Sequence, residues 1–405
     1  MTPLKVLLIA PQPFYSARGT PIAVRMLAEA LGAAGHQVDL LTLPHGEDVD
    51  LPGVRILRVS ALPGVTSVPI GPSFRKAGYD VKLLSRAARL LRSREYDVIH
   101  GVEDGALIAW VLSRTRVATP YIYDMDSHMS SQVHERGRLY GGLAGVFHAV
   151  EGRALRGAVG VLAVCPALVE VAREHQVIGQ VALLPDTPLQ SGDEVVPDPE
   201  VEALGALRVL YVGNLEKYQG IELLIQGFPD VVAAHPEARL IVVGGRPENI
   251  RRYLHRTEEL GIGDSVIFLG PRPLERLGPI LAAADILVSP RLKGVNTPMK
   301  IYSYLESGRP VVATRLRTHT QVLTDDVACL VPADAAGVSR GILRLAADPE
   351  LRDAMGSRAR RYVRAEFGPQ RFRQRLLDFY EEVAARIVPR ERNSGTGSAA
   401  GRTET

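Results

Sequence analysis

Short apolar runs alternate with amphipathic stretches along the chain. Residues 5–10 form a continuous apolar run of the kind that makes a buried parallel strand. Apolar residues then recur at helical spacing from Pro21, and a second apolar run covers residues 38–43. Further apolar runs follow at 97–100 and 121–123. The order of strand, loop, helix and strand predicts an α/β domain with a doubly wound parallel sheet.

The same alternation starts again in the second half of the chain. Apolar runs at 207–212, 240–243, 266–269 and 286–288 enclose stretches with helical spacing, whereas residues 186–206 are polar, acidic and proline-bearing. We therefore predict two doubly wound, Rossmann-like domains joined by a linker and followed by a last helix and a disordered tail. The predicted boundaries are 1–187 and 207–368 for the domains, 188–206 for the linker, 369–388 for the helix and 389–405 for the tail.

Polar residues follow the predicted strands of the first half. Ligands of doubly wound sheets lie beyond the carboxyl ends of the strands, so these residues and Gly19, in the first loop, should border one cleft. Asp126 and His128 are the candidate catalytic residues, because carboxylates and imidazoles suit general-base or charge-stabilising roles. The alternative is that such residues only cap helices. The other polar residues of the two clusters are His100, Glu103, Asp104, Asp124 and Ser127.

The stretch 290–314 joins a turn, a helix and a strand. Asn296, Thr297 and Pro298 predict a helix start, since a capping side chain precedes a proline in the first turn. A helix start offers unpaired N–H groups and partial positive charge, and Lys300 adds a full charge. These residues outline a phosphate site. The alternative is an ordinary loop-to-helix connection of an α/β domain.

Composition excludes several classes of protein. With 48 basic and 45 acidic residues, the net charge of +3 is too small to indicate a nucleic-acid partner. Cys165 and Cys329 lie far apart among apolar neighbours, so buried free thiols in a reducing compartment are expected. No apolar run approaches the roughly 18 residues of a membrane span. There is no dinucleotide or P-loop fingerprint. We predict a cytoplasmic protein.

A basic stretch covers residues 75–94. It holds seven basic residues and one acid, Asp80, with apolar residues on one predicted face. One interpretation is a solvated crossover helix. The other is docking on anionic lipid headgroups, which predicts a protein that is peripheral on the inner face of the membrane.

Beyond these patterns, the second half resembles the donor domain of glycosyltransferase family 4. The segments IELLIQGF, ARLIVVGG, DSVIFLGP, ADILVSPR and SGRPVVAT follow one another in that family's order. The first half is similar through the loop at Gly19 and the run LAEALGAAGHQVDLLT. The resemblance implies a GT-B fold, in which two doubly wound Rossmann-like domains face each other across a cleft. It also implies that the last helix crosses back onto the first domain.

The implied activity is retaining transfer of a sugar from a nucleotide-diphosphate donor to a saccharide or lipid-linked acceptor, without a bound metal or other cofactor. Cell-envelope polysaccharide or glycolipid synthesis is the expected setting. Lys300 matches a lysine of the family's TPxK helix variant and would face the donor phosphates, which makes it a third candidate catalytic residue beside Asp126 and His128. The donor-binding set that we assign is Gly19, Gly213, Asn214, Lys217, Gly244, Arg291, Thr297, Pro298, Ser303 and Glu306.

The chain departs from the family pattern at several of these positions. Two glutamates usually present are replaced by Val295 and Ser303, and Glu306, one helical turn further on, is the possible substitute. Asn214 stands where the family has a phosphate-binding arginine. Gln219 stands where it has a lysine, and the nearby Lys217 is a replacement.

A histidine of the family corresponds to Asp126, with His128 close by. These departures keep two rivals open. One is a non-catalytic GT-B scaffold that binds a sugar nucleotide or a partner protein. The other is a GT-B epimerase that acts on the sugar nucleotide itself.

Overall fold

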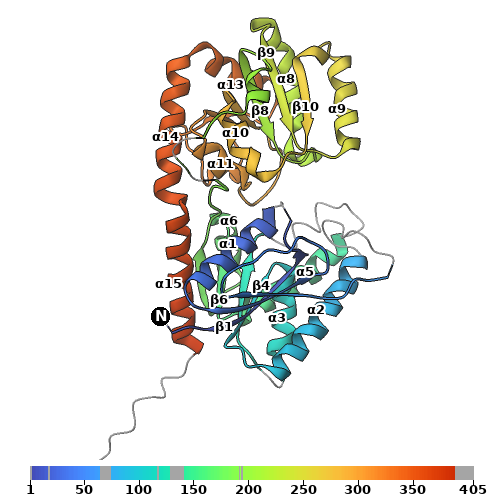
Figure 1. Ribbon diagram of the computed structural model, residues 1–405, viewed down its shortest axis with the longest axis vertical. Coiled ribbons are helices and arrows are strands. Elements are labelled where there is room, and N and C mark those ends of the chain that lie inside the picture. Colours follow the sequence, from blue (N-terminus) through green and yellow to red (C-terminus); the bar gives the residue numbers. More distant parts are fainter. Residues whose placement is uncertain are drawn as a thin grey trace, which may run out of the picture.

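Two α/β domains lie one above the other, and a long helical segment runs along one side of both (Figure 1). The computed structural model describes residues 2–16, 19–63, 74–115, 118–127, 141–190, 192 and 195–387. Both sheets are entirely parallel in their pairings, with helices between successive strands, as the alternating apolar runs predict. The predicted pair of doubly wound domains is confirmed.

The N-terminal domain contains a seven-stranded sheet in the order β3-β2-β1-β4-β5-β6-β7. Its central strands are buried on both faces, against one apolar cluster on each side, whereas the two edge strands are partly exposed. Its strands are β1 (Lys5–Pro13), β2 (Gln37–Leu43), β3 (Val54–Arg58), β4 (Val98–Val102), β5 (Tyr121–Met125), β6 (Gly160–Ala163) and β7 (Gln180–Leu183). Its helices are α1 (Gly19–Ala33), α2 (Phe74–Ser93), α3 (Asp104–Ser113), α5 (Gly141–Gly157) and α6 (Pro166–Glu174).

The C-terminal domain has a six-stranded sheet in the order β10-β9-β8-β11-β12-β13. Its strands are β8 (Leu207–Val212), β9 (Ala238–Val243), β10 (Val266–Gly270), β11 (Ile286–Ser289), β12 (Val311–Thr314) and β13 (Cys329–Val331). Its α-helices are α8 (Ile221–Ala234), α9 (Pro247–Glu259), α10 (Leu277–Ala282), α11 (Lys300–Glu306), α12 (Arg317–Thr320), α13 (Ala335–Ala347) and α14 (Pro349–Phe367). Three 3-10 turns are η2 (Lys217–Gln219), η3 (Gly263–Ser265) and η4 (Leu274–Arg276).

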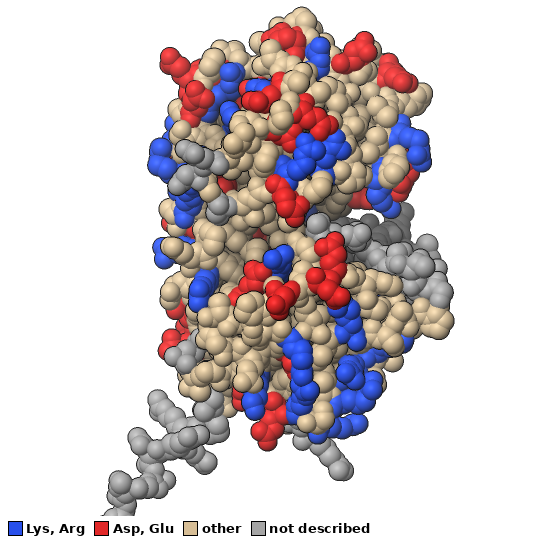
Figure 2. Space-filling view, in the orientation of Figure 1, with Lys and Arg blue, Asp and Glu red and all other residues tan. Residues whose placement is uncertain are grey.

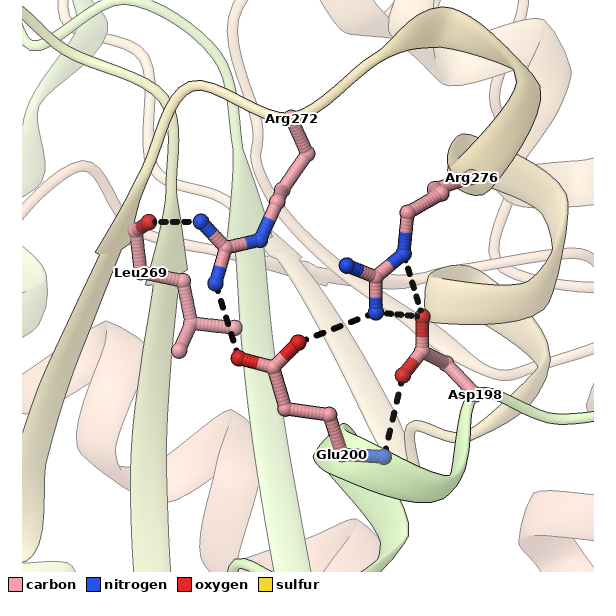
Figure 3. Close-up of polar contacts among 5 residues, drawn as sticks. All are labelled: Asp198, Glu200, Leu269, Arg272 and Arg276. Atoms are coloured by element: carbon pink, nitrogen blue, oxygen red, sulfur yellow. Dashed lines mark hydrogen bonds and ion pairs between the residues drawn. The ribbon is translucent and has the colours of Figure 1, made fainter.

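The second half of the predicted linker belongs structurally to the C-terminal domain. It forms a short helix, α7 (Pro199–Glu202), whose cap Asp198 accepts a hydrogen bond from the backbone N–H of Glu200. Figure 3 shows how two arginines hold it: Arg276 pairs with Asp198 at 2.6 Å and with Glu200 at 2.9 Å, and Arg272 pairs with Glu200 at 2.8 Å. The crossing between the domains is therefore made by the residues before Asp198.

The last helix, α15 (Pro369–Ile387), packs on the N-terminal domain. It follows α14 along the side of the molecule, with Gly368 in extended conformation between them (Figure 1). Phe372, Leu376, Phe379 and Tyr380 are buried beside α1 and the sheet. The predicted tail lies outside the described residues.

Two simpler expectations also meet the structure. Cys165 and Cys329 are both free and buried. In the part of the chain that the structure describes, no helix combines the length and the apolar character needed to cross a bilayer.

Candidate functional site

The loops after β8 and β9 bring bare backbone to the carboxyl edge of the C-terminal sheet. Gly213 has a φ of 148° and Gly244 a φ of 104°, both in the region that favours glycine. A Cβ on Gly244 would lie 2.3 Å from the Gly213 carbonyl oxygen, so the two loops are in contact. Both glycines were predicted to border the donor, and the structure brings them together.

Lys300 extends over these loops from the first residue of α11. Its Nζ lies 4.1 Å from the ring centroid of Tyr211 and donates to Gln219 Oε1 at 3.3 Å. A Cβ on Gly213 would stand 3.3 Å from the same nitrogen. Among the residues that the structure describes, no carboxylate forms an ion pair with Lys300. Burial, and then the charge of Arg291, lower the pKa of the Lys300 ammonium well below its usual value.

The loop after β8 uses its other polar groups to hold its own shape. The Tyr211 hydroxyl donates to the Asn214 carbonyl at 2.6 Å, and Asn214 Nδ2 donates to the Tyr218 hydroxyl at 3.4 Å. Lys217 is exposed at the start of η2. Of the two predicted donor ligands here, Lys217 presents its side chain to solvent, whereas Asn214 mainly shapes the loop.

Arg291, which we predicted as a donor ligand, holds the backbone of its own loop in this structure. Its buried guanidinium donates to the carbonyl oxygens of Lys293, at 2.6 Å, and Asn296, at 3.1 Å. Its own carbonyl accepts from Thr314 Oγ1 at 2.6 Å. Arg291 therefore folds the 291–296 loop around itself, and Thr318 Oγ1, which donates to the Asn296 carbonyl at 2.6 Å, closes it.

The predicted start of the donor helix is also corrected. Helix α11 begins at Lys300 after the cap residue Met299, which makes no side-chain cap hydrogen bond. Asn296, held by Arg291, does not cap the helix, and Thr297 and Pro298 are buried in the preceding loop. Lys300 is still at the start of the helix, as predicted from the sequence. The positive charge at this helix start comes mainly from the Lys300 side chain and less from a capped helix terminus.

Ser303 and Glu306 face away from the glycine loops. Ser303 Oγ accepts from the backbone N–H of Leu189 at 3.1 Å, which ties the linker to α11. Glu306 is buried and pairs with Arg364 of α14 at 2.8 Å. In this structure Glu306 is thus engaged by α14 and Ser303 by the linker, whereas Lys300 of the same helix contacts the glycine loops.

The N-terminal domain contributes a cluster of carboxylates. Glu103, with a φ of 49° at the end of β4, accepts from Gln12 Nε2 and Ser127 Oγ, both at 3.0 Å. Asp126 lies beside Thr20 in the first turn of α1. Burial, followed by the charge of Asp124 and other carboxylates, raises the pKa of Asp126 well above its usual value.

Asp186, directly after β7, belongs to the same cluster. Burial and the charge of Asp124 raise its pKa to about 7. We interpreted it from the sequence as the start of the linker, although its position after a strand is the signal that could have identified it. Gly19 is exposed with open space around it, as a close approach of substrate requires. His128 lies outside the described residues.

The loop that precedes α11 and helix α11 itself connect the two domains. Gln321 donates to the Val295 carbonyl at 2.9 Å and accepts from the Ala167 N–H at 3.3 Å, which joins the 291–296 loop to α6. Tyr302 of α11 is buried close enough to Asp186 for that charge to raise the pKa of its hydroxyl, after burial itself. Among the described residues, no three His, Cys, Asp or Glu side chains are placed to hold a metal ion.

The C-terminal domain thus contributes a lysine with no carboxylate partner among the described residues, and the N-terminal domain contributes a cluster of carboxylates. This set of groups suits a substrate whose leaving group is anionic while the reacting carbon gains positive charge. That is the demand of sugar transfer from an activated donor, and the two facing Rossmann-like domains are the architecture of GT-B glycosyltransferases.

Comparisons with known proteins agree. The family model described as "Glycosyl transferases group 1" matches residues 206–348, and the "Glycosyl transferase 4-like domain" matches residues 18–187. The chain belongs to glycosyltransferase family 4 and is a glycosyltransferase.

Several similar proteins match the chain over almost its whole length. It is 27% identical to the phosphatidyl-myo-inositol mannosyltransferase of Mycobacterium leprae, over 94% of this chain and 97% of that protein. Sucrose-phosphate synthase from Thermosynechococcus elongatus superposes with a TM-score of 0.79 at 25% identity, covering 95% of this chain and 100% of that one. The UDP complex of Anabaena HepE has a TM-score of 0.72 at 14% identity, over 93% of this chain and 100% of that chain, a likeness of fold.

Proposed function

We propose that the protein transfers a sugar, with retention of configuration, from a nucleotide-diphosphate donor to an acceptor hydroxyl. The observation that carries this proposal is Lys300, a cation with no carboxylate partner in the described part of the chain, held against the glycine loops after β8 and β9. Mannosyltransferases among the relatives favour a hexosyl donor.

Lys300 would serve the departing diphosphate. Its charge is already desolvated and positioned by Gln219 and Tyr211, so little reorganisation is needed when the leaving group gains charge. The backbone at Gly213 and Gly244 lies open beside it because neither residue has a side chain. Lys217, exposed on η2, is the second cation available to the phosphates.

The carboxylate cluster would serve the sugar. In retaining transfer the acceptor approaches the face from which the diphosphate leaves, and the anomeric carbon gains oxocarbenium character. Negative charge around Asp124 would stabilise that carbon. Asp126, whose raised pKa favours its protonated form, would donate a hydrogen bond to a sugar or acceptor hydroxyl.

The acceptor we propose is a saccharide or lipid-linked alcohol of the cell envelope, reached from the inner membrane surface. Basic side chains gather in the region of α2 (Figure 2), where Arg89 and Arg92 are exposed and Val81 is 66% exposed. Two other cations of this helix are occupied: Lys76 pairs with Asp104, and Lys82 donates to the loop before the helix. Each free arginine adds about 1 kcal/mol near an anionic surface.

A thermal-shift screen across nucleotide sugars tests the proposal. A ligand at 100 times its Kd adds about 2.7 kcal/mol to the free energy of unfolding. We expect one nucleotide diphosphate and its sugar to raise Tm in the wild type, and not in Lys300→Ala. A protein that no nucleotide diphosphate stabilises would contradict the proposal.

Product analysis then separates the chemistry. Transfer to an added acceptor, with the anomeric configuration kept, supports the proposal. Change of the sugar nucleotide without an acceptor would instead identify an epimerase, and binding without turnover would identify a scaffold. Activity that survives a chelator is expected, because we predict no bound metal.

A further inference from the structure

A buried chain of side chains links the C-terminal helix to the carboxylate cluster. The Tyr380 hydroxyl, on α15, lies 2.7 Å from His100 Nδ1, and His100 Nε2 lies 3.2 Å from Asp124 Oδ2. Tyr380 and His100 are fully buried, whereas the Asp124 side chain retains 16% exposure toward the cleft. The three residues come from α15, β4 and β5.

The donors and acceptors fix the direction of this chain. An ionised carboxylate only accepts hydrogen bonds, so His100 Nε2 must carry the proton that faces Asp124. Nδ1 of a neutral imidazole then accepts, and the Tyr380 hydroxyl donates to it. The two rings are stacked, with centroids 6.0 Å apart and an interplanar angle of 17°, so the imidazole has one orientation.

We propose that His100 and Tyr380 are positioning residues of the transfer site: Tyr380 selects the imidazole tautomer, and the imidazole N–H holds Asp124 at the cleft. This inference rests on the proposed glycosyl transfer for its catalytic consequence, and on the hydrogen-bond geometry alone for the tautomer.

The carboxylates around Asp124 explain why its orientation by a hydrogen bond matters. Glu103, Asp126 and Asp186 share the cluster with Asp124, and burial followed by the charges of neighbouring carboxylates raises the pKa of Asp126 and Asp186. Asp124 is the carboxylate of this cluster that lies within hydrogen-bond distance of the His100 imidazole, and its charge contributes to both of these pKa shifts. Asp124 thus sets the protonation of its neighbours.

The remaining titratable group packed against the chain does not compete for it. His36, at the start of β2, has its ring 5.4 Å from that of Tyr380, and its Nδ1 accepts from the Leu4 N–H at 3.0 Å. Burial lowers the pKa of His36, so its ring stays neutral. The proton arrangement of the chain is therefore decided by Tyr380 and Asp124.

The chain also makes the site depend on the docking of α15. Tyr380 reaches His100 only when the helix that leaves the C-terminal domain lies on the N-terminal domain. Undocking α15 removes the donor of Nδ1, and the imidazole can then exchange its proton between the two nitrogens. Asp124 loses its holder without any change in its own strand.

Imidazole ¹⁵N NMR of the whole protein gives the first test, with His100→Gln used to assign the signal. We expect a neutral ring protonated at Nε2 at pH 7.5 in the wild type, and a mixture of tautomers in Tyr380→Phe. Tyr121→Phe is the matched control, because it removes another buried tyrosine hydroxyl of the same sheet, bonded to the Ala154 carbonyl. A ring protonated at Nδ1 in the wild type would overturn the proposal.

Kinetics give the second test. His100→Leu removes the donor to Asp124, so the acidic limb of the kcat pH profile should move up by about one unit, with kcat lowered at least tenfold and the donor KM little changed. His100→Gln, which keeps an N–H at the Nε2 position, should restore most of kcat.

Tyr380→Phe should shift the same limb in the same direction, by less, and keep the fold if His100→Leu does not. A loss of stability with an unmoved pH profile would make the chain merely structural and refute the inference. A wild type that transfers no sugar would refute the proposed function instead, and the NMR result would still decide the positioning pair.

Discussion

Replacing Lys300 separates a functional cation from a structural one. A lysine that supports the fold pairs with a carboxylate, whereas Lys300 Nζ contacts an amide oxygen and an aromatic ring. The fall in its pKa means that its charge destabilises the unliganded protein. Lys300→Ala should therefore leave Tm unchanged or raise it, while the reaction loses its main leaving-group contact.

The size of the loss follows from the contact. Removing one preorganised donor to a developing charge costs about 2–4 kcal/mol, which corresponds to at least about a hundredfold in kcat for most of that range. Lys293→Ala is the matched control, since Lys293 lies on the same loop with an exposed side chain. Its loss should change kcat less than about twofold.

The assay is the initial rate of sugar transfer over a range of donor concentrations, with Tm measured on the same samples. The predicted pattern is a large fall in kcat/KM with no loss of Tm for Lys300→Ala, and neither change for Lys293→Ala. Near-normal turnover in Lys300→Ala would refute the reasoning. So would an equal loss in both variants, because a general loss of positive charge would then explain the effect.

Three further predictions concern other parts of the molecule. Glu306→Gln breaks the pair with Arg364 and should cost about 2 kcal/mol in urea unfolding, below the usual cost of a fully buried pair because Arg364 is 40% exposed. Its kcat should stay within about threefold; a loss of nucleotide affinity would return Glu306 to the donor site. Asp186 has a folded-state pKa raised from 3.8 to about 7, so the stability present in acid is lost as the pH rises across that interval. Above pH 7, Asp186→Asn should have a higher free energy of unfolding than the wild type, by up to about 4 kcal/mol, and therefore a higher Tm. This gain should vanish near pH 4. Reversing three charges of α2 should weaken sedimentation with anionic vesicles and leave binding to neutral vesicles unchanged, and unaltered binding to the anionic ones would reject membrane recruitment. The three residues are Arg86, Arg89 and Arg92.

The sheets could be predicted from sequence because their central strands are buried on both faces. Short continuous apolar runs, such as those of β1 and β8, are typical of strands buried between two layers of helices. The linker helix α7 was missed because two ion-pairing arginines hold it, and such partners are distant in sequence.

The site was harder to predict, because side-chain direction decides it. Lys300, Gly213 and Gly244 were chosen from their positions after strands and at a helix start, and the structure brings the three together. Glu306 was assigned by counting one helical turn from Ser303, which keeps the two residues on one face of α11. That face turns out to lie against the linker and α14, and nothing in the local sequence shows which neighbours a helix will meet.

The residues at which the donor site departs from the family pattern contact one another, which favours a modified site over one that has lost its function. The position of Gln219 carries a lysine in the resembling family, yet here its side-chain oxygen receives the Lys300 ammonium at 3.3 Å. A lysine at 219 would place two like charges at that separation in a half-buried site, which is costly. Gln219 is therefore a residue type that holds the Lys300 ammonium group without adding a second positive charge beside it. The absence of a lysine at position 219 and the presence of Lys300 are therefore linked. The phosphate site has one lysine, Lys300, held by Gln219, where the family pattern has a second basic residue.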